Sequence, residues 1–301
     1  MPNNLRLGFI GLGLMGKPMA GHLLKAGFPL TVHNRSQASV SELAAAGAKK
    51  AGTPRELTAA ADIVFLCLPD SPDVENASLG NDGIIEGAHA GLVVVDHSTI
   101  KPSTARKIAS KLAERGVKFL DAPVSGGQIG AENGTLTIMV GGDDVALESA
   151  RPAMQAYGKT ITRIGASGAG QVAKCCNQIM VAAQMAAMAE LLIFARKADV
   201  DPRKVVTSIK GGAAQCWTLD NKPDRLFAGN RQPGFKAHMQ VKDLNIVMDS
   251  AREIGMPLPA TEVNTRLYEE MVEMGLGELD NSAVVAVIEK LAGTKLFGET
   301  I

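Results

Sequence analysis

A glycine-spaced turn between an apolar run and a helix-like segment constrains this chain more than any other feature. Residues 5–10 are mainly apolar, and Gly11, Gly13 and Gly16 follow them in the spacing G-x-G-x-x-G. The first glycine permits a tight turn, the second lets a pyrophosphate approach the backbone, and the third lets the next helix pack closely. Because the N–H groups at the start of that helix face the turn, the pattern predicts a dinucleotide-binding βαβ unit. An ordinary glycine turn is the structural alternative.

The residue that contacts the cofactor ribose is expected at the end of the second strand, about 20 residues beyond the turn. Here Asn34, Arg35 and Ser36 follow the run at residues 30–33. An acidic residue at this place would bind the 2′-hydroxyl of NAD and repel a phosphate, whereas an amide, a guanidinium and a hydroxyl suit a 2′-phosphate. We therefore predict a preference for NADP(H), with NAD(H) as the alternative if Arg35 is only a solvated surface side chain.

Short apolar runs alternate with helix-like segments throughout the first half of the chain. After the first run, further runs rich in Val, Ile and Leu lie at residues 30–33, 63–68, 92–96, 117–120 and 136–140. Helical spacing of apolar residues appears between them, at residues 18–26, 37–46 and 103–115. Apolar strands that alternate with helices are typical of a mostly parallel sheet. The fold expected for residues 1–165 is therefore a Rossmann-type α/β domain.

Strand signals almost vanish after a glycine-rich junction at residues 164–170. The segment 171–197 is long and apolar, and further helices are expected at residues 202–210, 236–254, 260–274 and 282–292. Asp201 before Pro202 is the pattern of a helix N-cap followed by proline at the first helical position. Residues 166–301 are therefore expected to form an all-α domain built around one long helix.

Charge and composition argue against several other classes of protein. Lys plus Arg equals Asp plus Glu at 31 each, so no global field attracts nucleic acid or an anionic membrane. The longest apolar stretch, residues 179–195, is interrupted by Gln184 and Glu190, so no membrane span is expected. The first residues do not resemble a signal peptide, and a cytoplasmic protein is expected. The four cysteines and five histidines lack metal-ligand spacing, so no metal is expected.

Four motifs, spread over nearly the whole chain, carry a resemblance to a known family. They are FIGLGLMGKPMA at residues 9–20, DAPVSGG at residues 121–127, GAGQVAKCCNQ at residues 168–178 and KDL at residues 242–244. In these motifs the sequence resembles the β-hydroxyacid dehydrogenases, the 3-hydroxyisobutyrate dehydrogenase-like family. The resemblance implies an NAD(P)-dependent dehydrogenase of a small hydroxy acid or aldehyde acid, without a metal, assembled as a homodimer or homotetramer.

The resemblance also implies that Lys174 exchanges a proton with the substrate. Hydride transfer leaves an alkoxide that needs a proton, and one positioned acid or base supplies it. Lys174 lies among small and apolar residues at a helix start, where burial would lower its pKa toward neutrality. Asn177 is expected on the same side of the helix, whereas Gln178 stands where some relatives carry asparagine, so which amide assists Lys174 stays open. A lysine whose ammonium reaches solvent is the structural alternative.

The same resemblance assigns the substrate carboxylate to a loop of Ser125, Gly126 and Gly127. Glycines expose backbone N–H groups that bind anions, and Ser125 adds a hydroxyl, although a plain turn after Pro123 is the alternative. The cofactor-binding residues expected from the pattern and the resemblance are Gly11, Leu12, Gly13, Met15, Gly16, Asn34, Arg35, Ser36, Leu68, Pro69, Thr99 and Lys242. For Lys242, a surface ion pair with a neighbouring carboxylate is the alternative.

Two kinds of alternative stay open for the function. Within the family, the resemblance implies reduction of tartronate semialdehyde to D-glycerate with NAD(P)H, and the alternative substrates are 3-hydroxyisobutyrate, 4-hydroxybutyrate and L-serine. A non-catalytic dinucleotide-binding module is the alternative from another class, and loss of the proton-transferring lysine would be its mark. Because Lys174 is present, an enzyme acting on a small molecule is expected, with neither nucleic acid nor membrane as a partner.

Overall fold

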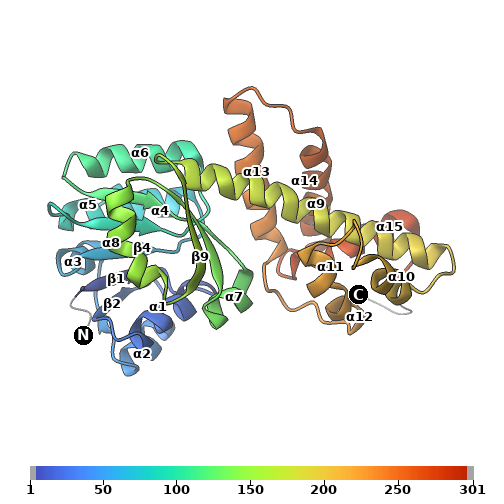
Figure 1. Ribbon diagram of the computed structural model, residues 1–301, viewed down its shortest axis with the longest axis horizontal. Coiled ribbons are helices and arrows are strands. Elements are labelled where there is room, and N and C mark those ends of the chain that lie inside the picture. The colour runs from blue at the N-terminus through green and yellow to red at the C-terminus, as the bar shows by residue number, and fades with distance from the viewer. Residues whose placement is uncertain (1–4, 297–301) are drawn as a thin grey trace. The chain divides into compact units, whose positions relative to one another are not determined.

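Two compact units make up the chain, and they divide between Lys174 and Cys175 (Figure 1). This computed structural model describes residues 5–296, so residues 1–4, which belong to the segment expected not to be a signal peptide, lie outside the described range. Helix α9 (Ala169–Lys197) contains the division, because its first residues belong to the first unit and the rest to the second.

The first unit contains one nine-stranded sheet. Its strands are β1 (Leu7–Ile10), β2 (Leu30–His33), β3 (Lys49–Lys50), β4 (Ile63–Leu66), β5 (Val93–Asp96), β6 (Lys118–Asp121), β7 (Val124–Ser125), β8 (Leu136–Gly141) and β9 (Gly158–Gly165). They lie in the order β3-β2-β1-β4-β5-β6-β8-β7, and β9 pairs with β8. Strands β1 to β6 pair in parallel, and β8 runs antiparallel to β6 and β7. This order is that of a Rossmann-type sheet, which confirms the predicted fold class.

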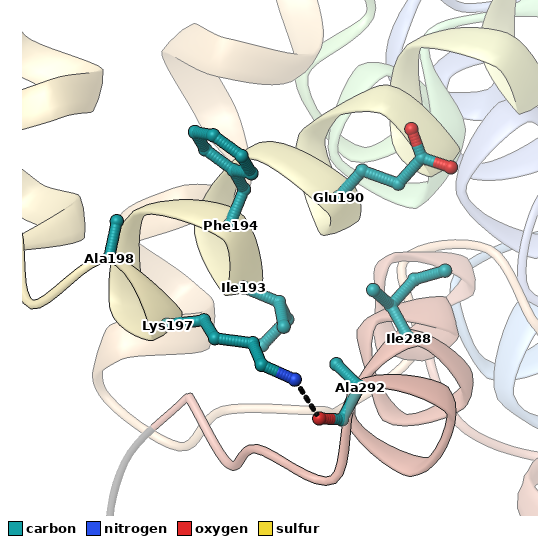
Figure 2. Close-up of a pocket in the computed structure, with 7 residues that line it drawn as sticks. All are labelled: Glu190, Ile193, Phe194, Lys197, Ala198, Ile288 and Ala292. Atoms are coloured by element: carbon teal, nitrogen blue, oxygen red, sulfur yellow. Dashed lines mark hydrogen bonds between the residues drawn. The ribbon is translucent and has the colours of Figure 1, made fainter.

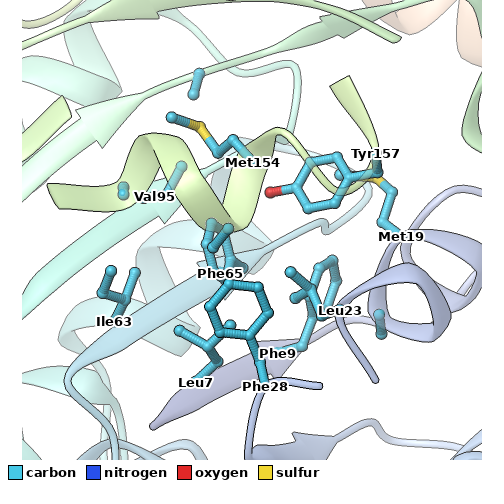
Figure 3. Packing of buried hydrophobic residues seen from close by; sticks show 14 of the residues in the cluster. Leu7, Phe9, Met19, Leu23, Phe28, Ile63, Phe65, Val95, Met154 and Tyr157 are labelled. Carbon is cyan, nitrogen blue, oxygen red and sulfur yellow. The ribbon is translucent and has the colours of Figure 1, made fainter. Parts of the chain in front are cut away.

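Helices cover both faces of this sheet. They are α1 (Gly16–Lys25), α2 (Gln37–Ala45), α3 (Pro54–Ala59), α4 (Ser71–Leu79), α5 (Ile84–Gly87), α6 (Pro102–Ala113), α7 (Gly127–Asn133) and α8 (Asp144–Met154). Because side chains alternate along a strand, Phe9 and Phe65 enter one apolar layer while Ile10 and Leu66 enter the other. Helices α1, α2 and α8 close the first layer, and Met19, Phe9 and Tyr157 belong to its buried cluster (Figure 3). Helices α3 to α6 close the second.

Three of the strands lie outside the apolar runs from which the sheet was predicted. β3 consists of two exposed lysines, and most side chains of β9 are exposed. β7 has only two residues and follows Pro123. Such strands are held by backbone pairing with a buried neighbour, so their side chains carry no apolar signal.

The second unit is helical, as the fold class predicts. Besides α9 it contains α10 (Pro202–Ile209), α11 (Trp217–Asn221), α12 (Pro223–Phe227), α13 (Ala237–Glu253), α14 (Pro259–Met271), η1 (Val272–Leu276), η2 (Asn281–Val284) and α15 (Val285–Ala292). Leu192 of α9, Leu244 of α13 and Tyr268 of α14 share one buried core. Asp201 accepts a hydrogen bond from the N–H of Arg203 at 2.9 Å, so the predicted N-cap of α10 is confirmed.

Helix α9 is more apolar than the sequence analysis allowed for. Among the residues that the structure describes, it is the one helix long and apolar enough to cross a membrane by length and composition alone. The expectation that no stretch reaches this limit was therefore wrong, because Gln184 and Glu190 interrupt the stretch while its mean hydropathy stays high. Half of its most apolar window is buried within the protein, as is typical of a core helix.

Candidate active site

The glycine turn between β1 and α1 has the geometry of a phosphate-binding loop. Gly11 has a φ of +95°, and a side chain there would overlap the carbonyl oxygen of Cys67. A Cβ atom at Gly16 would overlap the carbonyl oxygen of Gly11, whereas one at Gly13 would meet no described atom within 4 Å. The backbone is therefore closely packed at Gly11 and Gly16 and open at Gly13, where a pyrophosphate would approach. The first turn of α1 carries no acidic side chain, so its N–H groups fit an anion.

Asn34 ties the end of β2 to the glycine turn. Its Oδ1 accepts a hydrogen bond from the N–H of Leu12 at 3.1 Å, and its Nδ2 donates to Ser36 Oγ at 2.9 Å. Arg35 extends into solvent with 84% of its side chain exposed, and its Nη1 lies 3.7 Å from Asp73 Oδ1. The three residues expected near the ribose therefore lie beside the turn, with the guanidinium as the outermost group.

The ends of β4 and β5 are joined by a buried serine that was not among the predicted site residues. The N–H of Leu68 donates to Ser98 Oγ at 2.8 Å, and the N–H of Ser98 donates to Asp96 Oδ1 at 2.9 Å. Pro69 and Thr99 directly follow Leu68 and Ser98, so the bond holds the expected cofactor residues at one edge of the sheet. The pattern that could have revealed Ser98 is Asp-x-Ser at the end of a buried strand.

The start of α9 is fixed by Asp121 and Gln171, which were not among the predicted site residues. The carboxylate of Asp121 accepts from the N–H groups of Gly168 at 2.7 Å and Gln171 at 2.9 Å. Burial raises the pKa of Asp121 to about 6, although these backbone donors act in the opposite direction. The side chain of Gln171 donates to the carbonyl of Ser98 at 2.8 Å and accepts from the N–H of Ile100 at 3.1 Å. The helix is therefore held by both β5 and β6.

Lys174 lies one turn further along α9 and reaches the predicted substrate loop. It is only 7% exposed, and its Nζ donates to the carbonyl oxygen of Val124 at 2.9 Å. Val124 precedes Ser125, and the next two residues, Gly126 and Gly127, have φ values of +134° and +62°. Glycine adopts this conformation without strain, so the loop can turn here directly beside the ammonium.

A buried imidazole lies between the ends of β5 and β6. The Nδ1 of His97 lies 2.7 Å from the carbonyl oxygen of Ala122, and its Nε2 lies 2.8 Å from the hydroxyl of Tyr157. Its ring stacks on that of Phe65. Burial lowers the pKa of His97 to about 4, against the opposing effect of the bond to Ala122. His97 therefore serves as a neutral packing group, and within residues 5–296 no group of three His, Cys, Asp or Glu side chains is placed to hold a metal.

In the second unit, four polar side chains of α9 and α13 form a connected series. Asn177 Nδ2 donates to Gln178 Oε1 at 2.8 Å, and Gln178 Nε2 donates to Asp243 Oδ2 at 2.6 Å. Lys242 Nζ lies 2.8 Å from Asp243 Oδ1. Lys242 therefore does pair with a neighbouring carboxylate, but the pair is largely buried and is not the surface pair considered as the alternative. Both candidate amides are joined to it.

A groove at the other end of α9 lies apart from these residues in the sequence. It has a volume of about 480 Å³ and lies between α9 and α15 (Figure 2). Its lining residues are Glu190, Ile193, Phe194, Lys197, Ala198, Ile288 and Ala292. Phe194 is 78% exposed, and Lys197 donates to the carbonyl of Ala292 at 2.7 Å. The groove is apolar and lacks the paired polar groups of a catalytic site.

Comparison with known families defines the class of protein. The sequence model of the NAD-binding domain of 6-phosphogluconate dehydrogenase matches residues 6–165. That of the NAD-binding domain of NADP-dependent 3-hydroxyisobutyrate dehydrogenase matches residues 168–288. Together with the geometry of the glycine turn, these matches indicate a nicotinamide dinucleotide as the cofactor. The chain therefore belongs to the 3-hydroxyisobutyrate dehydrogenase-like family of NAD(P)-dependent hydroxyacid dehydrogenases, as the four motifs predict.

Individual relatives within this family carry different names. The chain is 41% identical to 2-hydroxy-3-oxopropionate reductase of Escherichia coli, over 97% of this chain and 100% of that one. It is 38% identical to an NAD-dependent L-serine dehydrogenase of Pseudomonas aeruginosa, over 96% and 99% of the two chains. The solved structure of Mycobacterium tuberculosis 3-hydroxyisobutyrate dehydrogenase with L-serine matches with a TM-score of 0.88 and 31% identity, over 95% and 99%. Family and fold therefore agree, and the relatives differ in substrate.

Proposed function

We propose that this protein reduces tartronate semialdehyde (2-hydroxy-3-oxopropionate) to D-glycerate with NAD(P)H, using Lys174 as the proton donor. The observation that carries this proposal is the buried ammonium of Lys174, 2.9 Å from the carbonyl of Val124 and beside the loop of Ser125. Similarity to the Escherichia coli reductase over the whole chain supports the choice of substrate.

The residues of the first unit can perform both the binding and the proton transfer. The nicotinamide cofactor, when bound, supplies the hydride that adds to the aldehyde carbon. Gly11, Gly13 and Gly16 fit its pyrophosphate, with Leu12 and Met15 as further backbone contacts. Leu68, Pro69 and Thr99 would line its nicotinamide half. In the helical unit, Lys242 would contact the cofactor.

Lys174 protonates the oxygen of the aldehyde as negative charge develops on it, and takes that proton back in the reverse direction. The carbonyl of Val124 accepts a hydrogen bond from this ammonium, which holds the ammonium beside Ser125. Ser125 and the N–H groups of Gly126 and Gly127 bind the substrate carboxylate. Asn177 follows Lys174 on the same side of α9 and binds the substrate next to the reacting carbon.

NADP(H) is the proposed cofactor. The guanidinium of Arg35 is exposed, and its contact with Asp73 at 3.7 Å is a solvent-screened surface pair that contributes little. A 2′-phosphate would therefore gain a strong charged partner without breaking a buried one. Asn34 and Ser36, already joined to each other beside the turn, would supply the neutral donors.

A substrate screen tests this function. NADPH and NADH oxidation would be followed with tartronate, methylmalonate and succinic semialdehydes and with glyoxylate. We expect the highest kcat/KM for tartronate semialdehyde with NADPH. A higher kcat/KM for succinic or methylmalonate semialdehyde would contradict the proposed substrate, and a preference for NADH would contradict the proposed cofactor.

L-Serine oxidation is the second candidate function. The Pseudomonas aeruginosa relative is named for this substrate, and the solved Mycobacterium tuberculosis relative was crystallised with L-serine. L-Serine and D-glycerate both carry a 3-hydroxyl and a carboxylate, so the same lysine and loop would serve. Measuring NADP⁺ and NAD⁺ reduction with L-serine, D-glycerate and 3-hydroxyisobutyrate compares the candidates directly.

We also propose a homodimer or homotetramer that works in the cytoplasm without nucleic-acid partners. Along α9, Cys176, Met180, Ala187 and Phe194 are exposed at helical spacing and form a mainly apolar stripe, which the exposed Glu190 interrupts. The stripe continues into the groove of Figure 2, and a second copy would remove both from water. Phe194→Glu should lower the oligomeric state measured by light scattering; an unchanged mass would argue against this surface.

A further inference from the structure

The polar side chains that connect α9 and α13 bond to one another in a fixed direction. This series, which we call the relay, consists of Asn177, Gln178, Asp243 and Lys242. Lys242 Nζ forms an ion pair with one oxygen of Asp243 at 2.8 Å, which makes Asp243 the anionic partner at the end of the relay. A carboxylate can only accept hydrogen bonds. Gln178, bonded to the other oxygen at 2.6 Å, must therefore present its Nε2 donor to Asp243. Both Gln178 and Asp243 are 2% exposed, so bulk water cannot replace Gln178 as the hydrogen-bond donor to Asp243.

The direction passes on from Gln178 to Asn177. With its amide nitrogen facing Asp243, Gln178 turns its carbonyl oxygen toward Asn177, and a carbonyl oxygen can only accept. Asn177 must therefore use Nδ2 as the donor in their bond of 2.8 Å. Asn177 uses its amide nitrogen within the relay, so its carbonyl oxygen, Oδ1, does not take part in the relay. One buried carboxylate thus determines that Asn177 presents an acceptor.

We infer that Asn177 Oδ1 accepts a hydrogen bond from a donor on C2 of the substrate, and so selects acids with a 2-hydroxyl or 2-ammonium group. The inference rests on the proposed function, in which Lys174 acts at C3 and Ser125 binds the C1 carboxylate. Asn177 lies one helical turn beyond Lys174, about 4.5 Å along the axis, within reach of the carbon next to C3. Gln178 and Asp243 are positioning residues, because they act through Asn177.

A polar site of this kind rejects ligands that lack the matching group. An unmatched Asn177 oxygen would lose its hydrogen bond with water and gain none from the substrate. Substrates with hydrogen or methyl at C2, such as malonate and methylmalonate semialdehydes, are therefore poor, and tartronate semialdehyde is good. L-Serine, with its 2-ammonium group, belongs to the same accepted class.

The test compares two aldehyde acids that differ only at C2. Wild-type kcat/KM with NADPH should favour tartronate over malonate semialdehyde by about 100-fold or more. Asn177→Leu should reduce this ratio to within about threefold of one, mainly by lowering kcat/KM for tartronate semialdehyde. Asp243→Asn and Gln178→Met, which remove the enforced direction, should each lower the ratio about tenfold.

A matched control comes from the same helix. Gln184 bonds to Thr218 at 3.0 Å outside the relay, so Gln184→Met should leave the ratio unchanged. If the relay only supports folding, Asp243→Asn will lower kcat/KM for both substrates alike, and the unchanged ratio would overturn the inference.

The outcomes also separate this inference from the proposed function. A wild type that reduces tartronate and malonate semialdehydes equally well remains a dehydrogenase of these acids, but overturns the inference. A wild type that reduces neither, yet oxidises L-serine in preference to 3-hydroxypropionate, supports the inference and overturns the proposed substrate. Activity on none of the four acids overturns both.

Discussion

The ammonium nitrogen of Lys174 lies 2.9 Å from the carbonyl oxygen of Val124, so one hydrogen bond joins the start of α9 to the proposed substrate loop. Lys174→Ala removes both this bond and the proposed proton donor. We expect kcat to fall by about 10³-fold or more, because no other group at this position supplies the proton. The Kd for NADPH, measured by fluorescence titration, should change by less than about threefold, since its binding uses other residues. Retention of near wild-type kcat would refute the assignment.

The cofactor preference can be tested at Arg35. Arg35→Ala should lower kcat/KM for NADPH by about 10- to 100-fold, because the 2′-phosphate loses a charged partner. For NADH, kcat/KM should stay within about twofold. The control is Arg55→Ala, which removes an arginine of α3 whose side chain is 57% exposed. It should leave kcat/KM unchanged for both cofactors. Equal losses with NADPH and NADH would show that Arg35 does not contact the phosphate.

Asp121 and His97 should make opposing contributions to the pH dependence of folding. Burial raises the pKa of Asp121 to about 6, so its contribution to stability is full at low pH and is lost as pH rises from about 4 to 6. Burial lowers the pKa of His97 from 6.5 to about 4, so its contribution is full above pH 6.5 and is lost as pH falls toward 4. Between these limits the two effects partly cancel.

Asp121→Asn should therefore expose the His97 effect. As pH falls from 6 to 4, the free energy of unfolding of Asp121→Asn should change by about 2 to 3 kcal/mol less favourably than that of wild type. His97→Gln should change the slope in the opposite direction. Urea unfolding of the three proteins at several pH values measures both differences. Parallel curves for wild type and Asp121→Asn would contradict the raised pKa of Asp121.

A buried ion pair in the helical unit should be sensitive to loss of one partner. Lys222 Nζ lies 2.7 Å from Asp280 Oδ1, and Asp280 also accepts from the N–H of Gly234 at 2.9 Å. Lys222→Met leaves this carboxylate buried without its cation and should cost about 3 to 5 kcal/mol of unfolding free energy. Lys111→Met, which breaks an exposed pair with Glu114, should cost less than about 1 kcal/mol. Urea unfolding of both variants measures these costs. Equal decreases in unfolding free energy for Lys222→Met and Lys111→Met would contradict the expected effect of burial.

The parts of the site that the sequence predicted are those defined by local spacing. Gly11, Gly13 and Gly16 act within one turn, and Lys174 lies in a motif of adjacent residues, so both could be recognised without coordinates. Asp121 belongs to another such motif, but its partner Gly168 is 47 residues away. Pairing over that distance depends on where β6 ends in the sheet, which residue spacing does not specify.

The same physical limit applies to the fold. Buried strands such as β1 and β4 are apolar throughout and were predicted, whereas β9 has mostly exposed side chains and was not. The direction of the relay was also beyond prediction, because it depends on contacts between Gln178 and Asp243, which lie 65 residues apart. Which amide carries which bond is decided only when the carboxylate is in place.

The apolarity of α9 has a consequence for synthesis. Translation produces α9 before α13, α14 and α15, so Met185 and Leu192 leave the ribosome before the helices that cover them exist. During that interval the nascent chain displays the most apolar segment it has, and hydrophobic exposure of this kind recruits chaperones. Chains truncated shortly after α9 would therefore aggregate or stay chaperone-bound, even though the preceding α/β unit is complete.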